Sequence, residues 1–261
     1  MKFIIVDLEW NPVHRNGKLI NQDITEIGAV EVSEVDGMVM IGRKFHSYVR
    51  PFNPISKKIK ELTNLQEPDT WLAPKFSLVI NRFDKWIGNE SYIFCSWGED
   101  DRNVLLKNLL LHHLDVKSFK HYFNLQSAFS KMVDEQSRNQ VGLIKAIESL
   151  GLIFEGAPHC SVDDAYNTAR VFTKVYNEIL VTPEPFVNNL VLDIDYRNRV
   201  NKVKHLRTKF KLSYQDLSLI SKISEEELEQ IESFQLTKNK KEITRLIKLL
   251  YSIRGETIGK R

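Results

Sequence analysis

The feature that most limits the fold of this chain lies in its first ten residues, where an apolar run from Phe3 to Val6 leads directly into Asp7-Leu8-Glu9. The run predicts a buried β-strand, and because strand side chains alternate between faces, Asp7 and Glu9 point the same way. Two carboxylates held together at the end of a core strand repel each other unless a cation neutralises them. The pair therefore indicates either a divalent-metal site or a solvated strand end where the acids only terminate the apolar run.

The following residues alternate between strand-like and helix-like patterns. Apolar runs bounded by turn residues predict strands at 3–8, 23–32, 44–49, 92–97 and 119–123. Apolar residues at helical spacing predict helices at 55–65, 74–87, 104–114, 140–150 and 163–180. Because strands and helices are mixed along the chain, we expect a layered α/β domain over residues 1–182.

A proline-containing segment, Val181-Thr182-Pro183-Glu184-Pro185, is the expected linker to a smaller all-α domain, and linker and tail are assigned to residues 183–261. The tail is helical in pattern throughout, with five short helices expected between about residues 200 and 253. Serines that precede acidic residues predict helix N-caps at Ser213 and Ser224, the second with the fuller capping box.

The net charge of +3 conceals an asymmetry. Residues 1–195 carry 21 Lys/Arg and 26 Asp/Glu, a net charge of −5, whereas residues 196–261 carry 16 and 8, a net charge of +8. A basic tail on a mildly acidic body indicates an anionic partner, with nucleic acid the first candidate. The alternative is a basic helical face that is simply solvated.

The composition also restricts the compartment. No stretch approaches the roughly 20 apolar residues of a membrane span, and no signal peptide is visible at the N-terminus. The two cysteines, Cys95 and Cys160, have no C-x-x-C spacing. We therefore expect a reduced, cytoplasmic protein that does not bind a membrane.

Further acids occur where a strand or a turn meets a helix. In Trp97-Gly98-Glu99-Asp100-Asp101 a predicted strand ends at glycine and a helix begins, and His159 stands in a turn five residues before Asp164. Acids in the first turn of a helix are common because the helix dipole favours them, which explains each segment alone. That explanation does not account for three acidic segments in this order.

Asp7-x-Glu9, Trp97-Gly98-x-x-Asp101 and His159-x-x-x-x-Asp164 together resemble the three-motif pattern of the DEDDh 3′–5′ exonucleases, which have a ribonuclease H-like fold. The resemblance covers about residues 1–180. It includes the segment Thr25-Glu26-Ile27-Gly28-Ala29-Val30, similar to the second strand of the family, and residues 59–65, similar to the helix after its third strand. Residues 154–156 and 163–170 resemble the ERI/KapD-type branch most.

The resemblance implies a ribonuclease H-like mixed sheet flanked by helices, with two Mg²⁺ or Mn²⁺ ions. Two metals about 3.5–4 Å apart stabilise the attacking and leaving oxygens of phosphodiester hydrolysis, and carboxylates are suitable hard ligands. The family pattern makes Asp7 the bridge between the metals, Glu9 and Asp164 ligands of the water-activating metal, and Asp101 a ligand of the second. His159 becomes the general base, since imidazole titrates near pH 6.5.

Several residues near this pattern have alternative interpretations. The family register favours Asp101 over Asp100 and Asp164 over Asp163, whose side chains are expected to be solvated or to cap helices. A Cys160/His159 nucleophile is disfavoured because adjacent loop side chains diverge.

The candidates for binding the 3′ end are the backbone near Trp10 and the side chains of Leu62 and Thr63. Trp10 departs from the small residue often found at its position in the family. Leu62 has the alternative of being an ordinary core residue.

Residues 203–250 weakly resemble a helix-turn-helix of the XRE repressor type, with residues 212–221 as its second helix and 223–232 as its recognition helix. The recognition helix would begin with Ser224-Glu225-Glu226-Glu227, and three acids disfavour reading a phosphate-rich groove. The basic residues lie at 197–211 and 238–248 instead. The tail is therefore expected to bind nucleic-acid backbone without sequence preference, or a protein.

The leading hypothesis is a metal-dependent 3′–5′ exonuclease acting on single-stranded nucleic-acid 3′ ends, with RNA favoured by the branch that the sequence resembles. A DNA 3′–5′ exonuclease is the second hypothesis, because no residue plainly reports a contact to a 2′-hydroxyl. A nucleic-acid-binding regulator with an exonuclease domain as scaffold is the third, and a complete set of acids disfavours it.

Overall fold

The computed structural model describes residues 1–15, 17–56, 59–60, 67–112, 114–116, 118–134, 139–187, 189–232 and 240–258. The chain divides into two compact units, Met1–Val187 and Asn188–Arg261. No helix formed by the described residues combines the length and apolarity that crossing a membrane requires.

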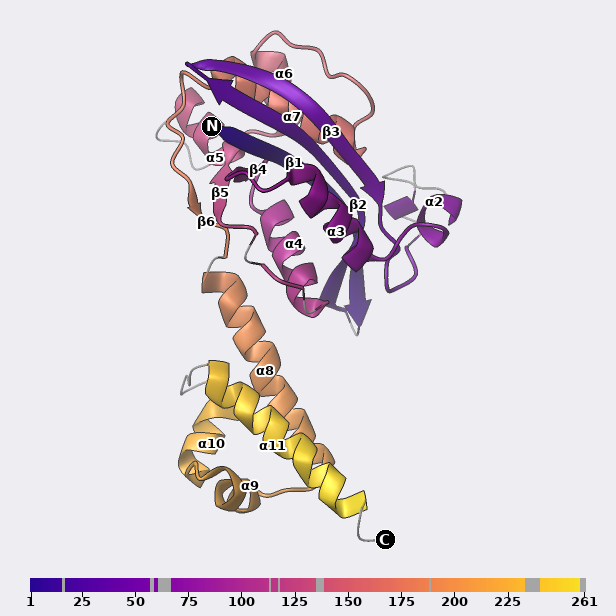
Figure 1. Cartoon of the computed structure of the whole chain (residues 1–261), viewed down its shortest axis with the longest axis vertical. Coiled ribbons are helices and arrows are strands. Elements are labelled where there is room, and N and C mark those ends of the chain that lie inside the picture. Colours follow the sequence, from indigo (N-terminus) through magenta and orange to yellow (C-terminus); the bar gives the residue numbers. More distant parts are fainter. Residues whose placement is uncertain are drawn as a thin grey trace. The chain divides into compact units, whose positions relative to one another are not determined.

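The first unit is built on a mixed sheet with the strand order β3-β2-β1-β4-β5-β6 (Figure 1). Its strands are β1 (Lys2–Arg15), β2 (Lys18–Val35), β3 (Met38–Tyr48), β4 (Ile93–Ser96), β5 (His121–Asn124) and β6 (Glu184–Pro185). Strands β1, β2 and β3 form an antiparallel meander, and β4 and β5 run parallel to β1. The two-residue strand β6 pairs antiparallel with β5, so residues 184–185 of the expected linker belong to this sheet.

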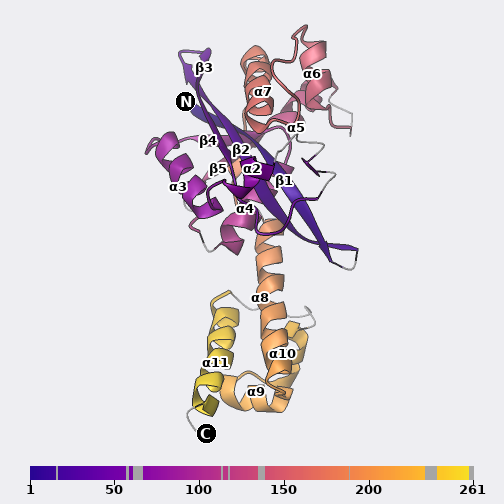
Figure 2. The ribbon, with the colours of Figure 1, turned by 90° about the vertical axis from the view of Figure 1, so that its right-hand side faces the viewer.

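Helices cover both faces of this sheet. They are α2 (Glu67–Trp71), α3 (Phe76–Ile87), α4 (Asp100–Leu111), α5 (Leu125–Val133), α6 (Leu143–Ser149) and α7 (Ser161–Val175). Figure 2 shows α3 and α4 on one side of the strands and α5, α6 and α7 on the other, and α7 packs against β1, β2 and β3. The α/β class predicted from the sequence, a mixed sheet flanked by helices, is confirmed.

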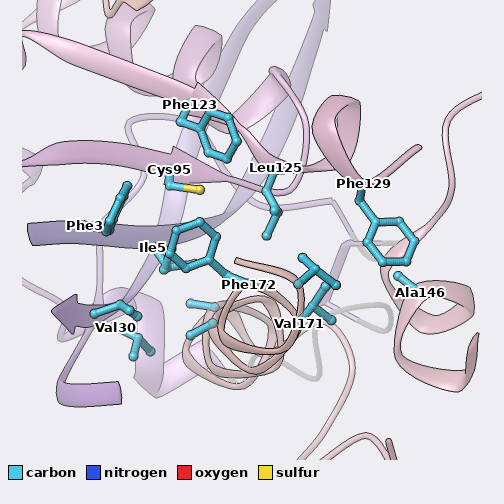
Figure 3. Packing of buried hydrophobic residues seen from close by; sticks show 14 of the residues in the cluster. Phe3, Ile5, Val30, Cys95, Phe123, Leu125, Phe129, Ala146, Val171 and Phe172 are labelled. Atoms are coloured by element: carbon cyan, nitrogen blue, oxygen red, sulfur yellow. The ribbon is translucent and has the colours of Figure 1, made fainter. Parts of the chain in front are cut away.

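The main core lies between the sheet and α7. Phe3 and Ile5 of β1 meet Phe172 of α7, and the rings of Phe3 and Phe172 are 4.8 Å apart in an edge-to-face arrangement (Figure 3). Cys95 of β4 and Val30 of β2 are fully buried in the same cluster. This core fixes α7 over the strands that carry the acidic pair.

The second unit is helical in its described residues. Its helices are α8 (Asn189–Lys209), α9 (Tyr214–Ser221), α10 (Glu225–Glu232) and α11 (Lys240–Ile258). Leucine, isoleucine and valine side chains from all four helices share one buried cluster. Arg207 of α8 forms a two-pronged ion pair with Glu232 of α10, with both N···O distances at 2.8 Å.

Several details differ from the sequence predictions. The segments 189–232 and 240–258 contain four helices, two of them long, so the expectation of five short helices between 200 and 253 is wrong. The reciprocal capping box is at Ser213, whose side chain exchanges hydrogen bonds with Asp216. The hydroxyl of Ser224 accepts the Glu227 N–H at 3.2 Å and donates to the Glu227 carboxylate at 3.3 Å, as expected of a helix N-cap. Helices α9 and α10 lie over the two segments that resemble a helix-turn-helix, and that assignment stays a prediction.

In the first unit, the strand predictions were correct in position, but they were too short for β1, β2 and β3 and slightly too long for β4 and β5. Residues 10–15 of β1 continue past the sheet core because they pair with residues 18–24 of β2. Helix α4 begins at Asp100, four residues before the predicted start, and α5 was not predicted. Most of the helix expected at 55–65 lies outside the described residues.

Candidate active site

The register of β1 and β2 collects the first acids on one face of the sheet. Asp7 is paired with Gly28 and Glu9 with Glu26, so the side chains of both acids and of Glu26 lie on the same side. The register slips between Glu9 and Trp10, where β2 contains one extra residue. A bulge of this kind bends the strand and changes the direction of the side chains beyond it.

Gly28 allows the N-terminus of α7 to lie directly on this face. A Cβ atom at Gly28 would stand 2.1 Å from the carbonyl carbon of Ser161, the first residue of α7. The carboxylate of Glu26 accepts hydrogen bonds from the Ser161 backbone N–H (3.1 Å) and from its hydroxyl (2.9 Å). Glu26 thereby holds the start of α7 against β2, and its position at a helix N-terminus suits a negative charge.

Asp101 reaches the pair from α4. Strand β4 pairs with β1 only from Phe3 to Ile5, so Leu8 of β1 lies beyond the part of β1 that is paired with β4. The carboxylate of Asp101 accepts the Leu8 backbone N–H at 2.9 Å, and the side chain is buried. The carboxylate is therefore held at the backbone between Asp7 and Glu9.

His159 and Asp164 enter from the turn before α7 and from its first helical turn. His159 has φ +66°, in the left-handed region that a non-glycine residue rarely adopts. Its backbone N–H donates to the Asp164 carboxylate at 2.9 Å, which stabilises this conformation. The possible ligand atoms of Glu9, His159 and Asp164 all lie within 4.8 Å of one another.

The two members of each pair of adjacent acids, Asp100/Asp101 and Asp163/Asp164, have different environments in the structure. Asp100 is exposed, whereas Asp101 is buried against β1. The carboxylate of Asp163 accepts the Ala157 N–H at 2.9 Å and so closes the turn before α7. A Cβ atom at Gly156 would stand 2.3 Å from this carboxyl group, so the turn requires glycine there.

Burial, reinforced by mutual repulsion, raises the pKa values of the carboxyl groups in this cluster. Burial, followed by repulsion from Asp101, Asp164 and Glu9, raises the pKa of Asp7 well above its ordinary value. Burial and the charge of Glu26 raise the pKa of Glu9 to about 8. Burial is also the largest cause at Asp101, whose pKa rises to about 7, and at Asp164, whose pKa rises to about 6. Four carboxyl groups that oppose one another's ionisation are a suitable donor set for divalent cations.

These shifts predict a pH-dependent stability for the metal-free protein. Between about pH 4 and 8 the folded state retains protons on Glu9, Asp101 and Asp164 that the unfolded chain has released, so raising the pH favours unfolding. We expect the melting temperature (Tm) in EDTA to fall between pH 5.5 and 8.5, and Mg²⁺ to raise Tm most at the upper end. Thermal melts at three pH values measure this.

A matched pair of variants tests the source of that dependence. Asp101→Asn should flatten the fall of Tm with pH, because it removes one of the opposed charges. Asp100→Asn removes an exposed charge that is only a minor cause of the raised pKa of Asp101, so it should change the fall much less. A Tm in EDTA that rises with pH would contradict the assignment.

The remaining predicted residues have different outcomes. Trp10 is partly exposed and follows the bulge beside Glu9. Leu62 and Thr63 lie outside the described residues. Burial and the nearby charge of Glu26 raise the pKa of the Cys160 thiol to about 11, which opposes the thiolate that a cysteine nucleophile requires.

Glu26 is the residue near the site that the sequence reasoning did not select. Its side chain is 2% exposed, its carboxylate binds Ser161, and its oxygen lies 2.8 Å from the His46 ring nitrogen. An acid within the apolar segment Thr25-Glu26-Ile27 was the available signal, since buried carboxylates need partners.

A large hollow elsewhere in the first unit has unsuitable chemistry for a polyanion. Its volume is about 660 Å³, and its lining includes neither the four acids of the cluster nor His159. Its lining includes Glu99, Glu178 and Glu184, with Lys131 as the basic residue. This lining has no excess of positive charge to bind a phosphodiester.

The comparisons with known proteins agree with this geometry. The family model described as RNase T, exonuclease, matches residues 4–172, a range that includes the four acids of the cluster and His159. The chain therefore belongs to this exonuclease family, a class of hydrolases. Membership implies divalent metal ions, and the carboxylate cluster contains the oxygen ligands that such ions prefer.

Individual relatives are distant. ERI1 exoribonuclease 2 of Danio rerio is 28% identical over 202 residues, which cover 67% of this chain and 35% of that protein. The probable 3′-5′ exonuclease KapD of Bacillus subtilis is 25% identical over 190 residues, 70% of this chain and 89% of that protein. The chain thus spans about a third of the length of the first relative.

Solved structures show the same fold. The nuclease domain of 3′hExo, a DEDDh family member bound to rAMP, has a TM-score of 0.61 at 24% identity, covering 69% of this chain and 96% of that domain. Cell-death related nuclease 4 has a TM-score of 0.60 at 21% identity, covering 69% and 66%. The ribonuclease H-like fold expected from the sequence is confirmed.

Proposed function

We propose that this chain hydrolyses phosphodiester bonds from the 3′ end of single-stranded nucleic acid, and that RNA is its preferred substrate. The observation that carries the proposal is the convergence of Asp7, Glu9, Asp101 and Asp164 from β1, α4 and α7, with His159 beside them. Relatives named as exoribonucleases support RNA. The exonuclease domain is proposed to span residues 1–182.

The four carboxylates form the proposed metal-binding set, with Asp7 placed centrally among the other acids. Two divalent cations held there, Mg²⁺ or Mn²⁺, would supply stabilisation of the charge on the attacking and leaving oxygens. The Leu8 N–H orients Asp101, and the His159 N–H orients Asp164. Both acids are thus preorganised by backbone donors, which lowers the cost of arranging them during the reaction.

His159 is the proposed general base. Its exposed imidazole would accept a proton from water as the water oxygen attacks the phosphorus that joins the last two nucleotides. The bond from this phosphorus to the O3′ of the penultimate nucleotide would break, the leaving O3′ would take a proton from solvent, and the terminal nucleotide would be released as a 5′-monophosphate. The proton on the imidazole must then leave to solvent before the next cycle. The exposure of the ring gives it that route.

His159→Asn should lower the rate of nucleotide release by about 10²–10⁴-fold. Asparagine tolerates the left-handed backbone found at this position, so the fold and Tm should be unaffected. Single-turnover cleavage with saturating metal measures the chemical step. His121→Asn, at an exposed histidine of β5, is the control and should retain full activity.

Binding of the 3′ end is assigned to backbone near Trp10 and to Leu62 and Thr63. Trp10 is partly exposed next to Glu9, so its ring is available to a terminal base. The proposed grip remains independent of base identity, because stacking on an aromatic ring accepts every base.

The proposal is tested by the products of matched oligonucleotides. Single-stranded RNA and DNA of one sequence, labelled at the 5′ end, are incubated with the protein in EDTA, Mg²⁺ or Mn²⁺ and resolved by length. We expect a metal-dependent ladder that shortens from the 3′ end, faster for RNA. Faster shortening of DNA would favour the DNA exonuclease, and tight binding without shortening would favour a regulator.

A further inference from the structure

A groove on the second unit is lined mainly by cations. Its volume is about 520 Å³, and its lining residues are Arg199 of α8 and Lys241, Thr244, Arg245 and Lys248 of α11. None of the described lining residues is acidic. Four of the five are positively charged at neutral pH.

The sequence of α11 explains this alignment. Lys241, Arg245 and Lys248 follow one another at intervals of four and three residues, which places them on one face of a helix. Ile243 and Leu246 occupy the opposite face and are buried in the core of the unit. The three cations are exposed, so packing of the apolar face presents them together to solvent.

The groove is held by a contact between its two helices. The Arg199 guanidinium of α8 donates to the Thr244 hydroxyl of α11 at 2.8 Å. The ion pairs found among the described residues include none to Lys241, Arg245 or Lys248, whereas Arg207 in the same unit is neutralised by Glu232. The groove therefore retains its positive charge, whereas the charge of Arg207 is balanced by Glu232.

Helix α10, which the sequence analysis compared with a recognition helix, begins with negative rather than positive charge. Helix α10 begins with Glu225 and Glu226, and both are exposed. A phosphodiester would be repelled at that helix end and attracted to the α8–α11 groove. Lys248 lies seven positions after Lys241, a rise of about 10 Å along the helix axis, which gives an extended row rather than a point site.

We propose that the α8–α11 groove is a second nucleic-acid site, which binds the phosphodiester backbone of single-stranded RNA without sequence preference. Arginine offers paired N–H groups to a phosphate and lysine a point charge, and neither reads a base in this role. Only the choice of RNA as the polymer rests on the proposed function. The groove itself is independent of the acidic cluster of the first unit.

The test compares two double variants of the full chain that lose equal charge. Arg245→Gln/Lys248→Gln neutralises the groove, and Lys204→Gln/Lys209→Gln neutralises exposed cations of α8 that do not line it. Binding of a 20-nucleotide single-stranded RNA is followed by fluorescence anisotropy in EDTA, at KCl concentrations from 50 to 300 mM. Circular dichroism melts establish that both variants are folded.

We expect the groove variant to weaken binding about fivefold at 150 mM KCl. It should also reduce the slope of log K against log[KCl] by about 1.4, since each phosphate contact to a single strand contributes about 0.7. The control should keep the wild-type slope. Equal slopes for wild type and groove variant would overturn the proposal. Polyglutamate, a polyanion without phosphate, is tested in the same binding assay, and a groove variant that loses polyglutamate binding but keeps RNA binding would also overturn it.

A parallel cleavage assay separates this inference from the proposed function. If Mg²⁺-dependent shortening of RNA occurs and the slopes are equal, the groove proposal fails and the exonuclease proposal stands. If no shortening occurs and binding still depends on Arg245 and Lys248, the exonuclease proposal fails and the groove proposal stands.

Discussion

Asp7→Asn is expected to reduce metal-dependent shortening of RNA by at least about 10³-fold and, in EDTA at pH 8, to raise the Tm of the same protein. Asp7 lies on β1 among Asp101, Asp164 and Glu9, and its burial together with their charges raises its pKa. Removing one charge relieves that repulsion in the metal-free state. It also removes the carboxylate assigned to bridge the metals, so stability and activity should change in opposite directions.

The measurement combines two assays on one preparation. Thermal melts in EDTA and in Mg²⁺ give the stability change, and single-turnover cleavage gives the rate. Asp100→Asn is the matched control, because Asp100 is an exposed acid next to the buried Asp101. Its charge affects the pKa of Asp101 but is not among the causes at Asp7, so the cleavage rate should be unchanged and Tm should change much less than in Asp7→Asn. An Asp7→Asn protein that cleaves RNA at the wild-type rate would remove the central residue from the proposed site.

Gly28→Ala should destabilise the first unit by about 2–3 kcal/mol and lower activity about 10²-fold. The added Cβ would stand 2.1 Å from the Ser161 carbonyl carbon and 2.2 Å from the Val162 nitrogen, both of them backbone atoms that cannot rotate away. The start of α7 must then move from β2. Asp164 would move with the helix and His159 with the preceding turn.

Urea unfolding and single-turnover cleavage measure the two effects. Gly142→Ala is the control, since nothing lies within 4 Å of the added Cβ and the backbone there has an ordinary φ of −72°. Wild-type stability in Gly28→Ala would mean that β2 and α7 can separate at little cost. The close approach of these elements would then have no role in positioning Asp164.

The two variants also show which parts of the site are predictable. Alternation along a strand puts Asp7 and Glu9 on one face, and this requires only local geometry. The spacing from Gly98 to Asp101 and from His159 to Asp164 identified the other candidates by resemblance. The importance of Gly28 could not be derived in this way, because the atoms that it must avoid belong to Ser161, 133 residues later in the chain.

The role of Glu26 also could not be predicted from the sequence. In the sequence it is an acid within an apolar strand, and its partners could not be identified. In the structure it caps the start of α7 and contacts His46 of β3, so it holds the framework that carries Asp164. Helix α5 was missed for a related reason, since its nine residues are fixed by packing of Leu125 and Phe129 into the main core.

By itself, the sequence determined the mixed α/β class, the order of the acidic segments and the charge difference between the two parts of the chain. These properties depend on residue type and on short spacings. The tertiary structure decided how Asp101 is held by the Leu8 N–H, and that cations of α8 and α11 line one groove. The reason is physical: contacts between residues far apart depend on register and packing, which no local pattern encodes.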